Sequence, residues 1–206
     1  MSLSNTSHII QKFELFVGDE TELSSAEELD LLQKIYNQVL ESHEWEFLKK
    51  EASGTVSTSL DYLSAPADFA SFIKNYDDKR VVYIGSNYEP YYVIPYNERR
   101  MYRNQSGFVY FDARQDRITF TKQPTVADSY EFDYIYVPSA LDTTSSNPVF
   151  PVRFWDILYH GMCVDNDIIQ MSEKARSYQR ENQTRYDQLL SNMKYWNDTI
   201  SGYDTY

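Results

Sequence analysis

Apolar side chains recur with different spacings in consecutive zones of the chain. In residues 1–48 and 139–196 they repeat every three to four positions, which is typical of helices that bury one face. Residues 49–138 instead contain short runs of Val, Ile, Thr, Tyr and Phe between Gly, Pro and Asn, which favours strands. Residues 197–206 are expected to form an extended tail. The order of zones predicts an α+β fold, in which the N- and C-terminal helices form one helical bundle and an antiparallel β domain is inserted between them.

The first zone contains two predicted helices. The first covers residues 7–17 and is interrupted by the Gly-Asp-Glu run that begins at Gly18. The second starts at Ser24 or Ser25, because a serine followed by two glutamates suits a helix N-terminus. Its apolar spacing continues to Trp45, near which we expect it to end.

The middle zone contains predicted strands with one apolar and one polar face. Ile118 and Phe120 alternate with polar residues, and every second residue from Tyr130 to Tyr136 is aromatic, with acidic residues among those between. Strands with one wet face indicate an antiparallel sheet. The predicted strands are residues 79–84, 91–95, 108–112, 117–121 and 130–137.

The last zone again predicts helices. Pro151 suits a helix start, because a proline there lacks only an N–H that has no partner inside the helix. An apolar stripe follows it and reaches Ile168, and a second long helix is expected over residues 173–196. The apolar stripe of this second helix is Tyr178, Tyr186, Leu189, Leu190, Met193 and Trp196.

Composition narrows the possible functions. The chain has 206 residues and a net charge of −12, which argues against broad nucleic-acid binding because Lys and Arg must neutralise the phosphates. The same charge suits a surface that DNA passes without adhering. A single cysteine, Cys163, excludes an internal disulfide framework and a zinc site built from cysteines. Without a signal-peptide pattern or a run of about 18 apolar residues, we expect no membrane association and folding in a reducing cytoplasm.

Catalytic and metal-binding patterns are absent from the sequence. His160 and Cys163 are the one conceivable nucleophile pair, but no neighbouring lysine or helix N-terminus would activate the thiol. The Asp165-Asn166-Asp167 run lacks the glycine and distant glutamate of a calcium loop, so a polar helix face is the favoured interpretation. We therefore expect no enzymatic activity, no cofactor and no metal site.

Two groups of side chains are candidates for contacts with other molecules. The first is the basic cluster of Arg99, Arg100 and Arg103, a candidate contact with DNA or with a neighbouring subunit. The alternative is that this cluster is a solvated loop. The second group is a set of rings and an aliphatic side chain at the C-terminus, which suit docking in a partner's groove. Its members are Tyr195, Trp196, Ile200, Tyr203 and Tyr206.

The alternative for the C-terminal group is that its members fold back onto the chain's own helices, and Trp196 is the strongest case for this. The abundance of tyrosine, 19 residues in all, fits either exposed interfaces or a β core with half-exposed strands.

An ordered series of short motifs runs along the chain. The motifs are Gly18-Asp19-Glu20, Trp45-Glu46-Phe47-Leu48, Asp61-Tyr62-Leu63-Ser64-Ala65-Pro66-Ala67-Asp68-Phe69, Ile118-Thr119-Phe120, Val137-Pro138-Ser139-Ala140-Leu141 and Phe150-Pro151-Val152-Arg153-Phe154-Trp155-Asp156-Ile157-Leu158-Tyr159-His160-Gly161. In this order, over about residues 7–196, they resemble the head–tail adaptors (connector or head-completion proteins) of tailed bacteriophages.

The resemblance implies a structural virion protein at the neck of the particle, assembled in the host cytoplasm. Members of the family form a ring of identical subunits under the portal protein, usually with the portal's twelvefold symmetry. The ring completes the DNA-filled head and offers an attachment surface to tail or nozzle proteins. DNA passes through it without sequence-specific binding. The family also implies that the C-terminal segment, about residues 195–206, inserts between portal subunits.

Two other functions remain open from the residues alone. The tyrosine-rich β zone could bind glycans or a host surface component by stacking sugars on rings such as Tyr91 and Tyr92. An enzyme that uses His160 with Cys163, or a pair of carboxylates, is the third possibility.

Overall fold

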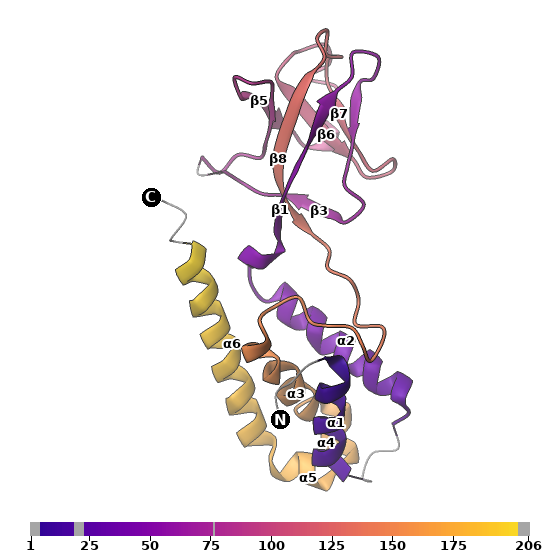
Figure 1. The fold of residues 1–206 in the computed structure, drawn as a ribbon, viewed down its shortest axis with the longest axis vertical. Helices are drawn as coiled ribbons and strands as arrows, with labels where there is room; N and C mark the ends of the chain where they lie inside the picture. The colour runs from indigo at the N-terminus through magenta and orange to yellow at the C-terminus, as the bar shows by residue number, and fades with distance from the viewer. Residues whose placement is uncertain (1–4, 19–22, 76, 202–206) are drawn as a thin grey trace. The chain divides into compact units, whose positions relative to one another are not determined.

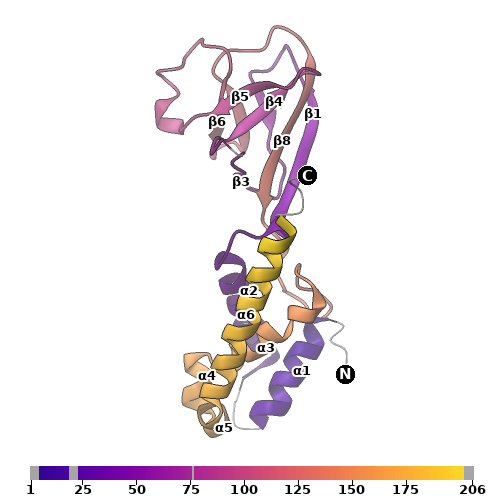
Figure 2. The same cartoon turned by 90° about the vertical axis from the view of Figure 1, so that its left-hand side faces the viewer.

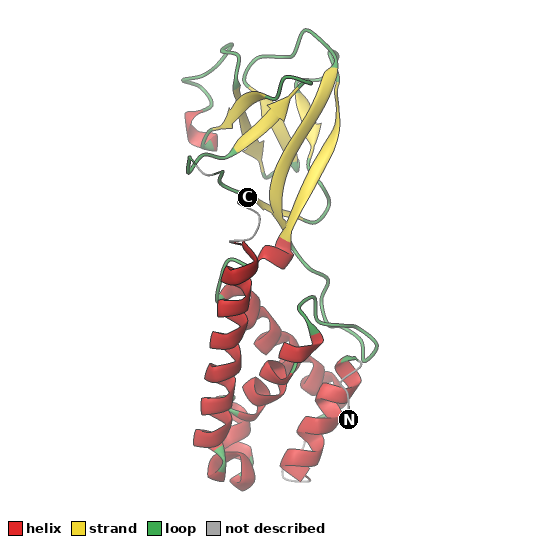
Figure 3. Ribbon diagram, turned by 60° about the vertical axis from the view of Figure 1, so that its left-hand side comes forward, coloured by secondary structure: helices red, strands yellow, loops and turns green. Residues whose placement is uncertain are grey.

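The computed structural model describes residues 5–18, 23–75 and 77–201. The chain divides into two compact units, a helical unit of Met1–Phe47 with Ser139–Tyr206 and a β unit of Leu48–Pro138. In the described residues every strand belongs to the β unit, as the colouring of Figure 3 shows. The predicted α+β class, with a β domain inserted between helical segments, is confirmed.

The helical unit is built from both ends of the chain. Figure 1 labels its α-helices, and two short 3-10 helices, η2 (Glu46–Leu48, which runs across the boundary of the units) and η4 (Val152–Phe154), accompany them. The α-helices are α1 (Thr6–Val17), α2 (Ser25–Glu41), α3 (Asp156–Cys163), α4 (Asn166–Met171), α5 (Glu173–Ser177) and α6 (Gln179–Ser201).

Local capping explains where the N-terminal helices begin and end. Ser24 and Glu27 form a capping box, which confirms the predicted start of α2. The predicted end near Trp45 is wrong, because α2 stops at Glu41. Trp45 is instead fully buried beyond the helix, where its indole N–H lies within hydrogen-bonding distance of two of the helix's last carbonyls, at 3.0 and 3.1 Å. The ring thus satisfies acceptors that a helix end leaves open.

The C-terminal zone is more divided than its apolar spacing predicts. The stripe that reaches Ile168 belongs to two helices, because Asp165 accepts a hydrogen bond from the backbone N–H of Asp167 and starts α4. The predicted helix over residues 173–196 is likewise split at Tyr178, which is 49% exposed. Helix α6 continues to Ser201, so the expectation of an extended tail is wrong for residues 197–201. Periodicity alone misses both breaks because helical spacing resumes after each of them.

Helix α3 is the centre of the helical unit. It lies between α1 and α6 and also packs against α2, as Figures 1 and 2 show. Six of its eight residues are buried. Gly161 allows the closest approach, because a Cβ at this position would clash with the side chain of Ile35 on α2 and lie 3.1 Å from the ring of Tyr186 on α6. A side chain larger than hydrogen is therefore excluded where these three helices meet.

The segment that returns from the β unit is packed onto the helical unit. Leu141 and Phe150 are 1% and 2% exposed. The Tyr36 hydroxyl of α2 accepts a hydrogen bond from the backbone N–H of Val149 at 3.2 Å, and Thr6 of α1 donates to the carbonyl of Ser146 at 2.7 Å. These contacts join the two ends of the chain into one core.

The β unit is an eight-stranded, nearly closed sheet in the described residues. Its strands follow the order β1-β8-β4-β5-β6-β7-β2, and β3 also pairs with β8. All pairs are antiparallel except β5 with β6, which run parallel, so the predicted antiparallel sheet has one exception. The strands are β1 (Lys49–Val56), β2 (Tyr62–Ser64), β3 (Phe69–Phe72), β4 (Val81–Ile84), β5 (Glu89–Val93), β6 (Phe108–Asp112), β7 (Arg117–Phe120) and β8 (Asp128–Tyr136).

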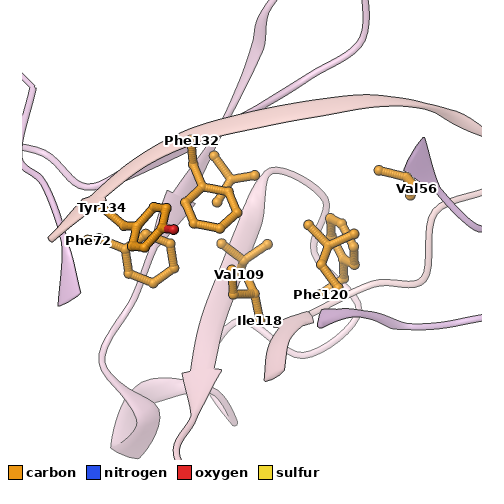
Figure 4. Close-up of a cluster of buried hydrophobic side chains, with 9 residues drawn as sticks. Val56, Phe72, Val109, Ile118, Phe120, Phe132 and Tyr134 are labelled. Atoms are coloured by element: carbon orange, nitrogen blue, oxygen red, sulfur yellow. The ribbon is translucent and has the colours of Figure 1, made fainter. Parts of the chain in front are cut away.

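Strand β8 organises the sheet and its core. Its inward residues Phe132 and Tyr134 are buried, and Tyr130 and Tyr136 pack against the same cluster, so the predicted aromatic face is confirmed. Figure 4 shows Phe132 and Tyr134 directed toward side chains from other strands, among them Ile118, which is fully buried. Strand β1 was not predicted, because it is mostly exposed and polar and its pairing with β8 decides its conformation.

We expect Gly161→Ala to destabilise the helical unit. Overpacking a core costs about 1–3 kcal/mol, which exceeds the gain in helix propensity of about 1 kcal/mol from replacing a glycine. Chemical denaturation followed by far-ultraviolet circular dichroism would measure the loss. In an Ile35→Ala background the same substitution should cost less, because the clashing methyl is gone. An equal cost in both backgrounds would contradict the packing argument.

A buried carboxyl group makes the stability of the helical unit depend on pH. Glu28 of α2 is 6% exposed, and burial, followed by the charge and hydrogen bond of Glu14 on α1, raises its pKa to about 7. The folded protein therefore holds the proton more tightly than the unfolded chain. The stabilisation of the folded state by this bound proton is fully present below pH 4.5, the ordinary pKa of a glutamate. It is lost as the pH rises through the folded-state pKa of about 7.

Glu28→Gln should remove this dependence. At pH 8 the variant should be more stable than the wild type by about 1 kcal/mol after allowance for solvent screening, whereas at pH 4 the two should be nearly equal. Glu41→Gln, an exposed change on the same helix, is the matched control and should show no such trend. Free energies of unfolding measured at both pH values would decide, and an equal effect of Glu28→Gln at pH 4 and pH 8 would rule out the titration.

Candidate interaction surfaces

The C-terminal part of α6 is held in place by polar contacts within the helical unit. Asn197, which is 2% exposed, accepts a hydrogen bond from the backbone N–H of Glu46 at 2.7 Å and donates one to the carbonyl of Glu44 at 3.0 Å. Next to it, the Nε2 atom of His43 lies 2.8 Å from the Oδ1 atom of Asp198. These contacts tie the last helix to the segment that follows α2. The sequence gives no sign of this role for Asn197, because an isolated asparagine in a helix carries no signal of burial.

The predicted C-terminal contact residues divide by exposure. Trp196 packs on Phe154 with ring centroids 5.5 Å apart, and the guanidinium of Arg153 lies 4.8 Å from its ring. The structure therefore places Trp196, which is half-buried, against other side chains of the helical unit. Tyr195, by contrast, is 76% exposed, and Ile200 is half-buried. Tyr203 and Tyr206 lie outside the described residues.

The predicted basic cluster lies on a loop that the sheet topology requires. Because β5 and β6 are parallel, the chain must cross over between them, and a crossover needs about a dozen residues. The loop between Val93 and Phe108 makes this connection and contains the 3-10 helix η3 (Tyr96–Glu98) followed by the arginines. The basic cluster thus projects from the one parallel pairing in the described sheet.

Hydrogen bonds fix this loop to the end of β7. The backbone N–H of Asn104 donates to the carbonyl of Thr121 at 2.9 Å, and the Thr121 hydroxyl donates to the carbonyl of Gln105 at 2.6 Å. Arg99 lies over the ring of Tyr96 at 3.8 Å and donates to its carbonyl at 2.6 Å. The loop is therefore preorganised, with its arginines presented from a supported backbone.

The three arginines and Lys122 surround a depression, which we call the basic pocket. It contains four cationic side chains and one carboxylate, Asp61, and has a volume of about 440 Å³. Lys122 and Asp61 come from segments distant in sequence from the arginines, so no sequence signal could have added them to the cluster. The lining residues are Asp61, Arg99, Arg100, Arg103, Asn104, Tyr110, Thr119, Phe120, Thr121, Lys122 and Gln123.

The helical unit contains a hollow of opposite charge, which we call the acidic hollow. It has a volume of about 340 Å³ and is bounded by α2 and α4. Lys34, its one cation, is paired with Asp165 at 2.7 Å. Four carboxylates surround apolar side chains, one of which, Met171, is 53% exposed. The lining residues are Leu23, Glu27, Asp30, Leu31, Lys34, Asp165, Asp167, Ile168 and Met171.

Charge is distributed unevenly between the two units. The β unit has 11 Lys and Arg against 12 Asp and Glu, a net charge of −1, whereas the helical unit has 8 against 19, a net charge of −11. The acidity of the chain therefore resides almost entirely in the helical unit. The basic pocket stands out against a nearly neutral β unit.

The tyrosines proposed for glycan stacking are not equally available. Tyr91 packs against the β core and lies edge-on to Phe120, with ring centroids 5.6 Å apart, while Tyr92 is 36% exposed beside Lys79.

A separate polar and aromatic hollow of about 490 Å³ lies elsewhere in the β unit. It is lined by Ser53, Gly54, Thr55, Tyr83, Gly85, Ser86, Tyr88, Ser129, Tyr130 and Glu131.

The conceivable nucleophile pair is built into the core. Cys163 is fully buried, and burial raises the pKa of its thiol to about 12, which keeps it protonated at neutral pH. Burial lowers the pKa of His160, whose Nδ1 lies 2.9 Å from the side-chain oxygen of Asn182. A protonated thiol is a poor nucleophile, so this arrangement does not activate Cys163.

No group of three or more His, Cys, Asp or Glu side chains in the described residues is arranged to hold a metal ion. In the Asp165-Asn166-Asp167 run, Asp165 is occupied as the N-cap of α4 and as the partner of Lys34.

Within residues 5–18, 23–75 and 77–201, no helix is both long and apolar enough to cross a membrane.

Comparison with known proteins identifies the family. No curated protein matches the chain. A family model described as "SU10 adaptor protein" matches residues 4–202, which is nearly the whole chain. The match includes the β unit and all but the ends of the helical unit, and it confirms the resemblance to phage adaptors. The chain therefore belongs to the SU10 adaptor protein family, whose members are structural adaptors of bacteriophages.

Proposed function

We propose that the protein is a ring-forming head–tail adaptor that binds the portal at the capsid vertex. The ring completes the DNA-filled head and provides the attachment surface for tail or nozzle proteins. Membership of the adaptor family supports this role, and the observation that carries it is the firmly anchored α6 with Tyr195 exposed near its C-terminal end.

The end of α6 has the properties of a docking element. Asn197 fixes the helix, so little conformational freedom is lost on binding. Tyr195 presents a large ring with a polar tip, the type of side chain that dominates protein interfaces. We propose that Tyr195, Ile200, Tyr203 and Tyr206 contact the portal. Trp196 supports them from within, because its ring is packed on Phe154.

The number of copies in the ring follows from the partner. A portal of twelvefold symmetry offers twelve equivalent sites, so a dodecamer is the state we propose on the portal.

The charge of −11 in the helical unit repels phosphates and suits a surface that DNA passes without adhering. The ring would then be part of the virion neck, assembled in the host cytoplasm.

Portal binding should depend on the C-terminal rings. We expect Tyr195→Ala, combined with Tyr203→Ala and Tyr206→Ala, to weaken binding to the portal of the same phage by about 2 kcal/mol or more, because interface tyrosines often contribute this much. Co-sedimentation of the full-length protein with purified portals would measure it, and electron microscopy would count the attached copies.

Tyr88→Ala is the matched control for the exposed ring. Tyr88 is 59% exposed but lies in the β unit, so its loss should leave portal binding unchanged. Thermal unfolding of each variant checks that the fold is intact. If the triple variant filled portals like the wild type, the C-terminal contact would be wrong, and if the wild type itself attached to no portal, the adaptor role would be wrong.

A further inference from the structure

We propose that the loop that contains Arg99–Arg103 docks into the acidic hollow of a second copy of this chain. In this contact Arg100, Arg103 and Lys122 of the basic pocket meet carboxylates of the neighbouring helical unit, and Met101 packs on the apolar floor of the hollow. The inference rests on the proposed ring and identifies one contact between adjacent copies.

The cations of the basic pocket are free to pair with an external group. In the part of the chain that the structure describes, Arg100, Arg103 and Lys122 form no ion pair with a carboxylate. Asp61 is the one acid that lines the same depression. At neutral pH the pocket therefore has a surplus of positive charge on a rigid backbone, which favours a negatively charged partner.

The composition of the loop points to a protein partner. Met101 is 73% exposed and Tyr96 is 37% exposed, beside the arginines. Arg, Met and Tyr are the residue types enriched in the centres of protein interfaces. A phosphate backbone would use the arginines but would leave the exposed thioether without an apolar contact. A partner that offers both carboxylates and an apolar surface uses the entire loop.

The acidic hollow offers this combination on a second copy. Asp30 and Asp167 are exposed carboxylates at its rim, and Leu31 and Met171 provide apolar surface between them. Glu27 also stays ionised, because hydrogen bonds from Ser24 lower its pKa. Lys34 does not oppose an approaching arginine strongly, because Asp165 neutralises it.

Long-range repulsion makes such a local contact necessary. Each copy has a net charge of −12, so two copies repel one another unless opposite charges meet at the interface. The basic pocket lies in the nearly neutral β unit, and the acidic hollow lies in the unit with the charge of −11. A contact between these two surfaces joins different faces of the two copies, so it is a heterologous, head-to-tail contact. Repeated from copy to copy, this kind of contact can close a ring.

Zero-length crosslinking tests the contact directly. A carbodiimide joins an amine to a carboxylate that touches it, and Lys122 is the one amine in the basic pocket. Rings would be assembled on portals from an equal mixture of light and heavy-isotope protein. We expect mass spectrometry to find Lys122 joined to Asp30, Asp167 or Glu27 in peptides of mixed isotope composition. Crosslinks from Lys122 found only within single copies would overturn the proposal.

A charge swap provides the second test. Arg100→Glu with Arg103→Glu should raise the protein concentration needed to fill the ring by about tenfold or more, because like charges would then face one another. Adding Asp30→Arg and Asp167→Arg to the same chain should restore ring filling. Arg80→Glu with Arg114→Glu is the matched control, since both arginines lie in the β unit outside the basic pocket. Circular dichroism checks the fold of each variant.

The outcomes separate this inference from the proposed function. If the Arg100→Glu/Arg103→Glu variant still binds portals as single copies but does not complete rings, both proposals stand. If it completes rings like the wild type, the copy contact is wrong and the adaptor role is unaffected. If it completes rings but loses affinity for a short DNA duplex, the basic pocket serves phosphates and this inference is overturned. If the wild type binds no portal, the proposed function fails on its own.

Discussion

The close packing of α2, α3 and α6 at Gly161 is the constraint on which the helical unit depends. Helix α3 is short and almost entirely buried, so it has no stability apart from its neighbours. Those neighbours come from opposite ends of the chain, which means that the N-terminal helices complete their core only after the β unit has been made. The returning segment, held by Tyr36 and Thr6, closes this arrangement. The end of α6 is anchored separately, by the hydrogen bonds between Asn197 and the backbone of Glu44 and Glu46.

The β unit depends in the same way on one strand. Strand β8 pairs with β1, β3 and β4, and its aromatic face fills the core. The sheet nearly closes through the parallel pairing of β5 with β6, and this pairing demands a long connection. The loop with Arg99, Arg100 and Arg103 is that connection. A surface with a candidate role in assembly thus arises from a topological requirement of the sheet.

The two units also divide the electrostatics between them. In the ring that we propose, the acidic helical unit would suit a position near DNA that must slide, and the local positive charge of the β unit would offer a place for contact with an acidic neighbour. The one conceivable nucleophile pair is not activated, because Cys163 is buried with its thiol pKa raised to about 12, and His160 lies against Asn182. The described surfaces combine charged side chains with exposed rings and apolar groups, which are residue types found in protein interfaces.

The sequence alone determined the elements whose signals are local. Periodicity and capping placed α1, the start of α2 and the strands at Phe108, Arg117 and Tyr130, and the order of motifs identified the family. Only the tertiary structure decided the pairing of the polar strand β1, the packing of the half-buried Trp196 on Phe154 and the addition of Lys122 to the arginines. The structure also revealed the helix breaks at Val164 and Tyr178. The physical reason is that the pairing of β1, the packing of Trp196 and the position of Lys122 depend on partners distant in sequence, which leave no trace in the local sequence. The helix breaks have local caps, but the apolar spacing resumes after them and hides them.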